Sequence, residues 1–449
     1  MKTVLNAQAK AELVIQLERA NQAFARHYLG DIRGRQPVHT VYGGAHLFRS
    51  DTASKLGALA LSALDQYAPN SSVLADAIGL SNSKDDASHA LVLNERIRAK
   101  LRKEPVEDYR IDFEDGYGIR SDAEEDEHAL QAAMESAKGL ENATLPPFFG
   151  IRIKSFQEHE RERAMRTLDV FLSALCERTR GRLPPNFVVT LPKVSLVEHA
   201  RTLAELFDIL ESELHIPRGA LKMELMVETP QSIINARGEI ALPHLVRAAD
   251  GRCSSVHFGA YDYTAACHLT AVHQSLSHPI CDAARHLMQA SLAGMDVWLS
   301  DGATNVLPVP IHREKELSAE QRAQNQRAVH QAWKQHFEDV RHSLSQGFYQ
   351  GWDLHPAQLV TRYAALYDFY ETNMDAMGRR LRGFFEKAAR ATTLGTAFDD
   401  AATGRGLLNF FLRAVHCGAI SESEACAATG LSAMDFQSGS LTNISKMIG

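Results

Sequence analysis

The sequence has few cysteines, and they form no recognisable disulfide or metal-binding pattern. Its 449 residues include six cysteines, and no two of them are spaced as CxxC. Scattered cysteines in a chain of ordinary globular composition indicate small buried side chains in a reducing compartment. We therefore expect a cytoplasmic protein with neither a disulfide framework nor a cysteine-based zinc site.

Long apolar runs and an excess of basic charge are also missing. No stretch approaches the roughly 18 uncharged apolar residues that predict a transmembrane helix. Glu12 and Glu18 interrupt the apolar positions of the N-terminal stretch, which predicts an amphipathic helix and not a signal peptide. The formal net charge is −7, whereas nucleic-acid binding needs a basic surface. We expect neither a membrane nor a nucleic acid as a partner.

Several common catalytic signatures are absent. The sequence contains no GxxxxGK[ST] or GxGxxG phosphate-binding loop and no GxSxG elbow of a serine hydrolase. Gly43 and Gly44, in the stretch VYGGAHLF, are the glycines best placed to let backbone amides approach a substrate. An ordinary tight turn explains the same two residues, so both interpretations stay open.

What the sequence does contain is a regular alternation of short apolar runs and long amphipathic segments. Runs that are apolar nearly throughout are typical of strands buried on both faces, as in a parallel sheet. Eight such runs alternating with helices predict an α/β fold, the (β/α)8 TIM barrel. The predicted strands are 38–44, 109–115, 148–154, 186–193, 222–230, 254–262, 296–301 and 351–356, and clear helices span 156–178, 195–214 and 317–346.

Two helical segments lie outside a minimal barrel. We expect the N-terminal helix to lie against the outside of the barrel, and the C-terminal helices to be separated by turns at TGRG (403–406) and CGA (417–419). The predicted parts are an N-terminal helical segment at 1–37, a barrel domain at 38–374 with an insertion at about 70–106, and a C-terminal helical extension at 375–449.

Charged residues gather at the ends of the predicted strands. In a TIM barrel the reacting side chains lie at the C-terminal ends of the strands, on one rim. Carboxylates, cations and one histidine therefore converge there: Glu114, Asp115, Arg152, Lys154, Lys193, Glu228, Asp262, Asp353 and His355.

A magnesium site explains this convergence. Mg²⁺ takes one or two carboxylates and completes its octahedron with water and substrate oxygens. Glu228 and Asp262, on neighbouring strands, are the best candidate pair, and Glu114 with Asp115 is the second choice. Arg152 would hold a substrate carboxylate or carbonyl oxygen in a fork, and metal and arginine together would stabilise an enolate.

Each of these residues also has a structural explanation. An Asp or Glu at a strand end is often a helix cap or a solvated loop charge. Strand alternation places Asp112 on the opposite face of the strand from Phe113, and we interpret Asp112 as structural. Lys193 would then be an ordinary rim charge and His355 a turn histidine. The prediction of an active site rests on the convergence and not on any one residue.

The motifs, taken in series, resemble a known family. VYGG, DFEDGYG, GIRIK, TLPKV, MVETP, FGAYDYTA and GWDLHPAQ occur in the order found in the citrate lyase beta-subunit-like group of the HpcH/HpaI aldolase superfamily, over roughly residues 38–370. The resemblance implies a Mg²⁺-dependent (or Mn²⁺-dependent) TIM barrel, often a homo-oligomer. It makes or breaks C–C bonds next to a carbonyl, acting on a small carboxylate or a CoA thioester.

The resemblance also assigns roles by motif. Glu228 and Asp262 match the metal ligands, and Glu114 and Asp115 match the acidic pair that binds the water shell of the metal. Arg152 matches the arginine that binds the substrate carboxylate and the oxyanion. His355 and Gln358 match the closing motif, and His355 joins Arg152, Lys193, Gly43 and Gly44 as the expected substrate-binding residues. The DGYG stretch, the insertion and the C-terminal helices depart from the pattern and leave the substrate open.

Three functions follow as hypotheses. The first is a C–C lyase or aldolase acting through the enolate of a 2-oxo acid or acyl-CoA, with Asp115, Glu114 and Arg152 as catalytic groups. The second is a malate-synthase-like condensation of an acyl-CoA with glyoxylate, in which Asp399 or Asp400 of the C-terminal helices would supply an acidic residue, although a helix cap also explains that pair. The third is a non-catalytic barrel with a binding or regulatory role.

Overall fold

Eight parallel strands form the centre of the molecule in a computed structural model that describes residues 4–30, 34–80, 84–390 and 401–438. They pair in the order β7-β6-β5-β4-β3-β2-β1-β8. Backbone hydrogen bonds from Asp301 to Gln350 (2.8 Å) and from Trp352 to Gly302 (3.1 Å) link the residues that follow β7 to the beginning of β8. The predicted (β/α)8 barrel is therefore confirmed. The strands are β1 His39–Gly44, β2 Asp108–Asp112, β3 Phe148–Arg152, β4 Phe187–Leu191, β5 Lys222–Val227, β6 Cys253–Phe258, β7 Trp298–Ser300 and β8 Gly351–Asp353.

The interior of the barrel is polar, although the strands read as apolar runs. The hydroxyl of Tyr42 on β1 donates to Glu224 on β5 at 2.9 Å, across the barrel. Arg110 also bonds Glu224 at 2.9 Å, and Thr190 bonds it at 2.8 Å. Each of these polar residues alternates with apolar neighbours such as Ile111, which is fully buried. The apolar residues therefore face the surrounding helices, while a buried layer of paired charges fills the barrel.

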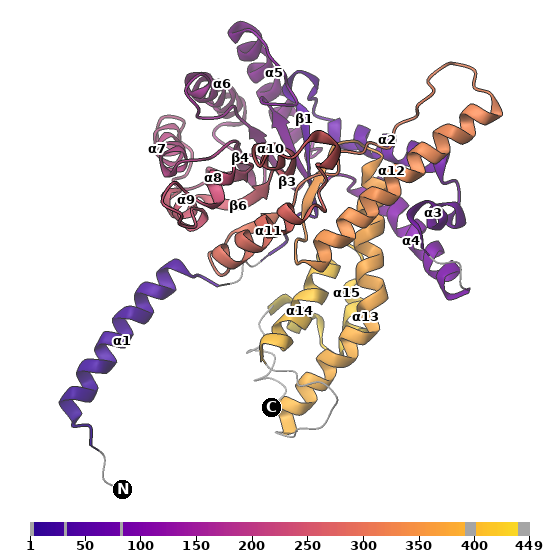
Figure 1. The fold of residues 1–449 in the computed structure, drawn as a ribbon. Coiled ribbons are helices and arrows are strands. Elements are labelled where there is room, and N and C mark those ends of the chain that lie inside the picture. Colours follow the sequence, from indigo (N-terminus) through magenta and orange to yellow (C-terminus); the bar gives the residue numbers. More distant parts are fainter. Residues whose placement is uncertain (1–3, 31–33, 81–83, 391–400, 439–449) are drawn as a thin grey trace.

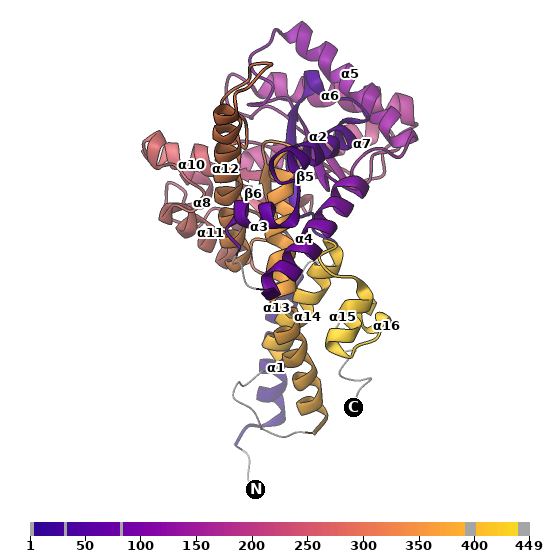
Figure 2. The same ribbon diagram turned by 90° about the vertical axis from the view of Figure 1, so that its right-hand side faces the viewer.

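Helices surround the barrel, as Figure 1 shows. The long α12 and α13 lie side by side on one flank in both views (Figures 1 and 2). The helices of the barrel are α2 Thr52–Tyr67, α5 Asp122–Glu141, α6 Arg161–Thr179, α7 Val197–Glu213, α8 Pro230–Ile233, α9 Leu242–Ala248, α10 Ala260–Ala266, α11 Pro279–Leu292, α12 Ala319–Ser345 and α13 Gln358–Arg390, with short 3-10 turns η1 Ala45–Leu47 and η2 Ala271–His273.

The predicted insertion is helical and lies against α12 and α13. It contains α3 Ser71–Ile78 and α4 Lys84–Lys103. His89 on α4 bonds Asp368 on α13 at 3.0 Å, and Arg96 lies 3.1 Å from Glu371 on the same helix. These ion pairs fasten the insertion to the last barrel helix.

The C-terminal helices differ from the prediction at one turn. α14 Ala401–His416 runs straight through TGRG, so the turn expected at residues 403–406 is wrong. A side chain on Gly404 would come within 2.8 Å of the Phe384 ring, so this glycine lets α14 approach α13 closely. The turn at CGA is confirmed, because Gly418 has a φ of +80° between α14 and α15 Glu422–Thr429. The last described helix is α16 Ala433–Ser438.

The described C-terminal helices lie toward the N-terminal end of the barrel. Arg413 on α14 bonds Gln36 at 2.8 Å and lies 4.1 Å above the ring of Tyr349. Gln36 precedes β1 and Tyr349 precedes β8, so both mark the ends where the strands begin. In Figure 1, α14 and α15 lie beside the lower half of α13, away from α8 and α10. Asp399 and Asp400 lie outside the described residues.

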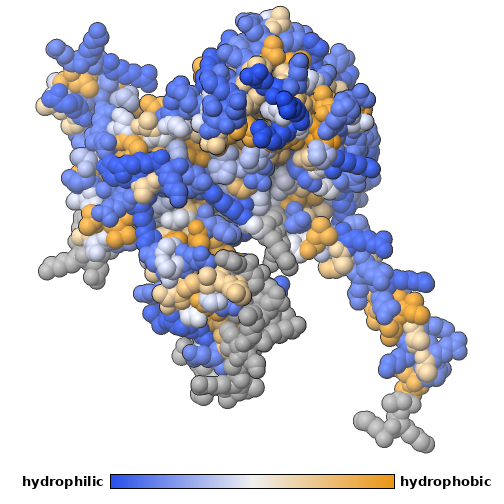
Figure 3. Space-filling view, turned by 180° about the vertical axis from the view of Figure 1, so that it is seen from behind, coloured by the Kyte–Doolittle hydropathy of each residue, from blue (hydrophilic) through white to orange (hydrophobic). Residues whose placement is uncertain are grey.

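The N-terminal helix does not pack against the barrel as expected. α1 Ala7–His27 is an amphipathic helix in which no residue is buried. Its apolar residues Leu13, Leu17 and Phe24 are 52% to 62% exposed, and Figure 3 shows apolar surface along this helix. The segment meets the body at Gly30, whose amide bonds the carbonyl of Gly294 at 3.2 Å. Among the described helices, none is long and apolar enough to cross a membrane.

Candidate active site

Arg152 lies inside the mouth of the barrel, the opening formed by the C-terminal ends of the strands. Both sides of its guanidinium group contact other side chains. It occupies the end of β3, where Nε and Nη2 bond the two oxygens of Asp112 at 2.7 and 2.6 Å. Nη1 lies 2.9 Å from Glu114, and the guanidinium stacks 4.8 Å above the ring of Tyr42. Asp112 therefore occupies the side of the guanidinium that was predicted to bind a substrate carboxylate. Nη1 faces the acidic cluster, which consists of Glu114, Asp115, Glu228 and Asp262.

Glu228 follows β5 and is almost fully buried, with 2% of its surface exposed. The backbone N–H of Lys193 donates to its Oε1. A side chain on Gly259 would lie 2.5 Å from the Cβ of Glu228 and 3.0 Å from Oε2, so the glycine leaves room for this carboxylate. Burial, followed by the negative charge of Glu114, raises the pKa of Glu228 to about 8. The positive charges of Arg152 and Lys193 act in the opposite direction but do not outweigh burial and Glu114.

Asp262 lies in the first turn of α10, directly after β6. It is exposed, and it is close enough to Glu228 for its charge to contribute to the raised pKa of that residue. The two predicted metal ligands therefore follow the neighbouring strands β5 and β6, one buried and one exposed.

Glu114 and Asp115 join the same cluster through Lys193. The ammonium of Lys193 donates to Glu114 and lies 3.3 Å from Asp115. The side chain of Glu114 is 4% exposed and that of Asp115 is 59% exposed, so the first is part of the buried cluster and the second lies at its solvent edge. Burial, which outweighs the nearby cations, raises the pKa of Glu114.

Gly43, at the end of β1, and His355, after β8, line one small cavity of about 90 Å³. A side chain on Gly43 would collide with the hydroxyl of Tyr109, and one on Gly44 would lie 2.6 Å from the carbonyl oxygen of Gly116. Both glycines are therefore required by packing at the end of β1, whether or not a substrate approaches them.

The closing motif organises the start of α13. Nδ1 of His355 accepts the amide of Ala357 at 3.2 Å, and Oε1 of Gln358 accepts the amides of Leu354 and His355 at 2.7 and 3.1 Å. Burial lowers the pKa of His355, which keeps it suited to accept this bond. The turn interpretation of His355 therefore has direct support, alongside its place in the small cavity.

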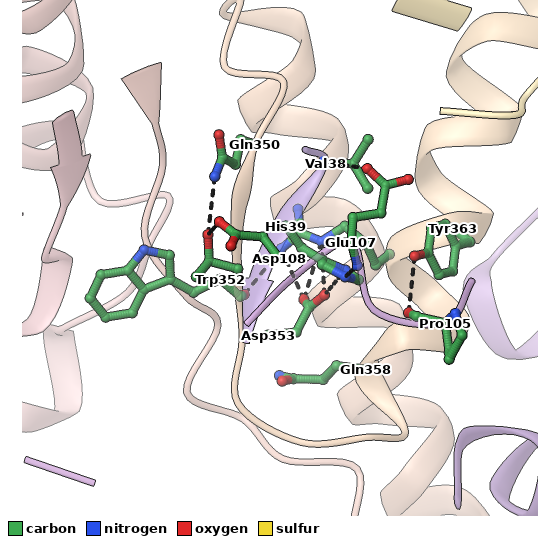
Figure 4. A network of polar contacts seen from close by, with 12 residues as sticks. Val38, His39, Pro105, Glu107, Asp108, Gln350, Trp352, Asp353, Gln358 and Tyr363 are labelled. Carbon is green, nitrogen blue, oxygen red and sulfur yellow. Dashed lines mark hydrogen bonds and ion pairs between the residues drawn. The ribbon is translucent and has the colours of Figure 1, made fainter. Parts of the chain in front are cut away.

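Asp353 does not join the mouth, although it was a candidate at the end of its strand. It lies 2.9 Å from Nδ1 of His39 and 3.0 Å from Nε2 of His336, and Nη2 of Arg362 bonds it at 2.9 Å. Figure 4 shows Asp353 beside His39, in a network of polar contacts that also includes Glu107. Odd-numbered positions of β8 face the helices, so Asp353 joins the barrel wall to α12 and α13.

Sequence reasoning missed part of the mouth. Tyr42 stacks on Arg152 on one side and lies 4.7 Å from the ring of Trp352. The indole Nε1 of Trp352 is buried without a hydrogen-bond partner. Tyr42 shares the inward face of β1 with Gly44, two positions on, and that alternation was the signal available in the sequence.

The acidic cluster offers oxygen ligands, which suit Mg²⁺ or Mn²⁺ better than zinc or copper. In the described part of the chain, no group of three or more His, Cys, Asp or Glu side chains is arranged to hold a metal. Two carboxylates with the remaining positions left to water and substrate are a usual arrangement for Mg²⁺. Such an ion would add positive charge beside the buried Glu228, where Arg152 and Lys193 do not outweigh burial and Glu114.

Comparison with known proteins identifies the family to which this chain belongs. A family model described as "Domain of unknown function (DUF6986)" matches residues 17–444. No curated protein matches the chain.

Solved structures of similar shape include native malate synthase from Haloferax volcanii at 3 mM glyoxylate. It is 14% identical to this chain with a TM-score of 0.45, and the match covers 90% of this chain and 100% of the malate synthase chain. Its magnesium/glyoxylate complex is 15% identical, with a TM-score of 0.43 and coverage of 92% and 95%. Protein CitE from Mycobacterium tuberculosis, in complex with magnesium and acetate, is 13% identical, with a TM-score of 0.37 and coverage of 74% and 91%. These similarities in shape do not assign a function to this chain.

Proposed function

We propose that this chain, which belongs to the family described as Domain of unknown function (DUF6986), is a magnesium-dependent enzyme that breaks or makes a C–C bond next to a carbonyl. Its substrate would be a 2-oxo acid or an acyl-CoA that reacts through an enolate. Two kinds of support are combined: the motif series that resembles the citrate lyase beta-subunit-like group, and the geometry of the barrel mouth.

One observation carries the proposal: the mouth holds more negative than positive charge. The carboxylates of Glu114, Glu228 and Asp262 influence one another there, and the pKa of Glu228 is raised to about 8. Glu114 has Arg152 and Lys193 as ion-pair partners, whereas the buried Glu228 accepts a backbone N–H. Buried charges are costly unless they are paired or coordinate a metal. A divalent cation held by Glu228 and Asp262 would supply the missing charge.

The ion, when bound, would polarise a substrate carbonyl and stabilise the developing oxyanion. Arg152 contributes a second, fixed positive charge, because Asp112 holds its guanidinium in one orientation. Its Nη1 faces the cluster, where negative charge develops on the substrate. Asp115, at the solvent edge, is the group best placed to exchange a proton with a substrate atom at the mouth.

The substrate-binding roles of Lys193, His355, Gly43 and Gly44 remain predictions. Gly43 and His355 share a cavity of about 90 Å³, which is smaller than the several hundred Å³ of a typical ligand site. We therefore expect the reacting part of the substrate to lie over the cluster and not in this cavity. A CoA thioester remains a candidate, as does a homo-oligomeric assembly.

The experiment that tests the function is the Glu228→Gln variant. We expect it to retain the fold, by circular dichroism and thermal unfolding, and to lose turnover at least about 100-fold, since it removes a direct metal ligand. Turnover would be followed by mass spectrometry on a panel of 2-oxo acids, hydroxy acids and their CoA thioesters with Mg²⁺. Full activity of Glu228→Gln on a substrate that the parent protein converts would refute the assignment.

The condensation with glyoxylate is the competing enzymatic reaction. It would release free CoA thiol in a glyoxylate-dependent manner, which a thiol reagent detects. The described C-terminal helices lie toward the opposite end of the barrel, where Arg413 bonds Gln36, and this placement favours the lyase. A barrel that binds neither Mg²⁺ nor Mn²⁺ in calorimetry would favour the non-catalytic role.

A further inference from the structure

Lys193 contacts three of the four acidic side chains at the candidate metal site. Its ammonium donates to Glu114 and lies 3.3 Å from Asp115, while its backbone N–H donates to Glu228. It follows β4 with a φ of 51°, a left-handed conformation that non-glycine residues adopt at a cost. This backbone conformation lets one residue reach the cluster with both its amide and its side chain.

We propose that Lys193 is a built-in counter-cation of the metal site. Its ammonium neutralises Glu114 and Asp115 while the site is empty, and it leaves them when a divalent cation binds. The inference rests on the proposed function, because it takes Glu228 and Asp262 as the ligands of that cation.

Electrostatics gives the direction of the exchange. A divalent ion held by Glu228 and Asp262 attracts the neighbouring carboxylates of Glu114 and Asp115 more strongly than an ammonium does, and it repels the ammonium itself. The side chain of Lys193 is 26% exposed, and lysine is a compact charge on a flexible four-carbon stem. Lys193 can therefore move toward solvent without opening the barrel.

The other cations near the mouth are held in place. Arg152 is 4% exposed and its fork is engaged by Asp112. Lys154 bonds the carbonyl oxygen of Phe113 at 2.7 Å and lies 3.0 Å from Glu125 on α5. Arg152 also contacts Glu114, but its bonds to Asp112 hold it in place, and Lys154 is held by Phe113 and Glu125. The exchange is therefore assigned to Lys193.

The test is the affinity for Mn²⁺, measured by calorimetry and by electron paramagnetic resonance on the purified full chain. Lys193→Met removes the competing charge, and we expect its Mn²⁺ affinity to rise about three- to fivefold, the upper range for one lost ion pair. Lys193→Arg keeps the charge and is expected to stay within about twofold of the parent protein. Lys154→Met makes the same charge change on the same rim without touching the cluster, and its affinity is expected to be unchanged.

Thermal unfolding provides a second readout. Without metal, Lys193→Met leaves the carboxylates less compensated, so we expect a lower Tm than that of the parent protein. Saturating Mn²⁺ should then raise the Tm of this variant by more than it raises that of the parent. Lys154→Met again serves as the matched control for the loss of one rim lysine.

The outcomes separate the two proposals. If the parent protein binds Mn²⁺ and Lys193→Met binds it equally or more weakly, Lys193 only positions the cluster and the counter-cation role is overturned, while the proposed function stands. If neither protein binds Mn²⁺, while both remain folded, the metal site and the counter-cation role are overturned together.

Discussion

Arg152 and Asp112 form a two-bond ion pair inside the barrel, with Nε–Oδ1 at 2.7 Å and Nη2–Oδ2 at 2.6 Å. Arg152 is 4% exposed and Asp112 is fully buried. Asp112 also accepts the amides of Glu114 and Gly116 at 3.0 and 2.8 Å. One carboxylate thus holds both the arginine and the loop that carries the acidic pair.

Removing Asp112 should therefore destabilise the protein strongly. We expect Asp112→Ala to lower the free energy of unfolding by about 3 to 5 kcal/mol, because it leaves Arg152 buried without its main partner. The double variant Asp112→Ala/Arg152→Ala should lose clearly less than the sum of the two single changes. Urea unfolding of the four proteins in a double-mutant cycle checks this, and additive losses would contradict the coupling.

The barrel itself could be predicted from the sequence, because eight apolar runs and the helices between them carry their own periodicity. The residues at the strand ends were also found, since a TIM barrel places those ends on one rim. The partners of these residues could not be found. Tyr42 and Glu224, for example, are 182 positions apart, and their contact exists only because the sheet closes.

Two errors have a common physical origin. TGRG was interpreted as a turn because glycines favour turns, but Gly404 instead allows α14 to approach the Phe384 ring of α13. Asp353 was counted with the mouth, but its position in β8 turns it toward His336 and Arg362. Local composition does not distinguish a glycine of a turn from one of a helix contact, nor the two faces of a three-residue strand.

Gly259 offers a way to perturb the metal site without touching its ligands. A methyl group at this position would lie 2.5 Å from Cβ of Glu228, so Gly259→Ala should displace the carboxylate. We expect the Mn²⁺ affinity to fall by about 10- to 100-fold, as for other supports of metal ligands. Gly406→Ala, at a helical glycine with open space around it, is the matched control. If calorimetry gave the two variants equal affinity for Mn²⁺, the predicted displacement of the Glu228 carboxylate would be refuted.

His89 should make the attachment of the insertion depend on pH. Its hydrogen bonds to Asp368 and Glu371 raise its pKa to about 9, from about 6.5 in the unfolded chain. The interaction of protonated His89 with Asp368 and Glu371 is therefore fully stabilising below about pH 6.5, and this stabilisation is lost as the pH rises through about 9. At pH 6, we expect His89→Gln to be less stable than the parent by on the order of 2 kcal/mol, with the difference vanishing near pH 10. Urea unfolding at both pH values checks this, and a difference that is constant with pH would contradict it.

Gly378 sets how closely α15 lies against α13. A methyl group on Gly378 would collide with the backbone oxygen of Ala428, whereas one on Gly383 of the same helix would meet open space. We expect Gly378→Ala to lower the stability by about 1 to 3 kcal/mol through overpacking. Gly383→Ala should be neutral or stabilising by up to about 1 kcal/mol, since alanine is the better helix former.

Thermal unfolding compares the two variants, and hydrogen exchange locates the effect. Faster exchange in α15 for Gly378→Ala, but not for Gly383→Ala, would show that the loss arises at the contact between the helices. Equal exchange in both variants would mean that α15 does not depend on this glycine. The C-terminal helices would then be held chiefly by side-chain contacts such as that of Arg96 with Glu424, at 2.6 Å.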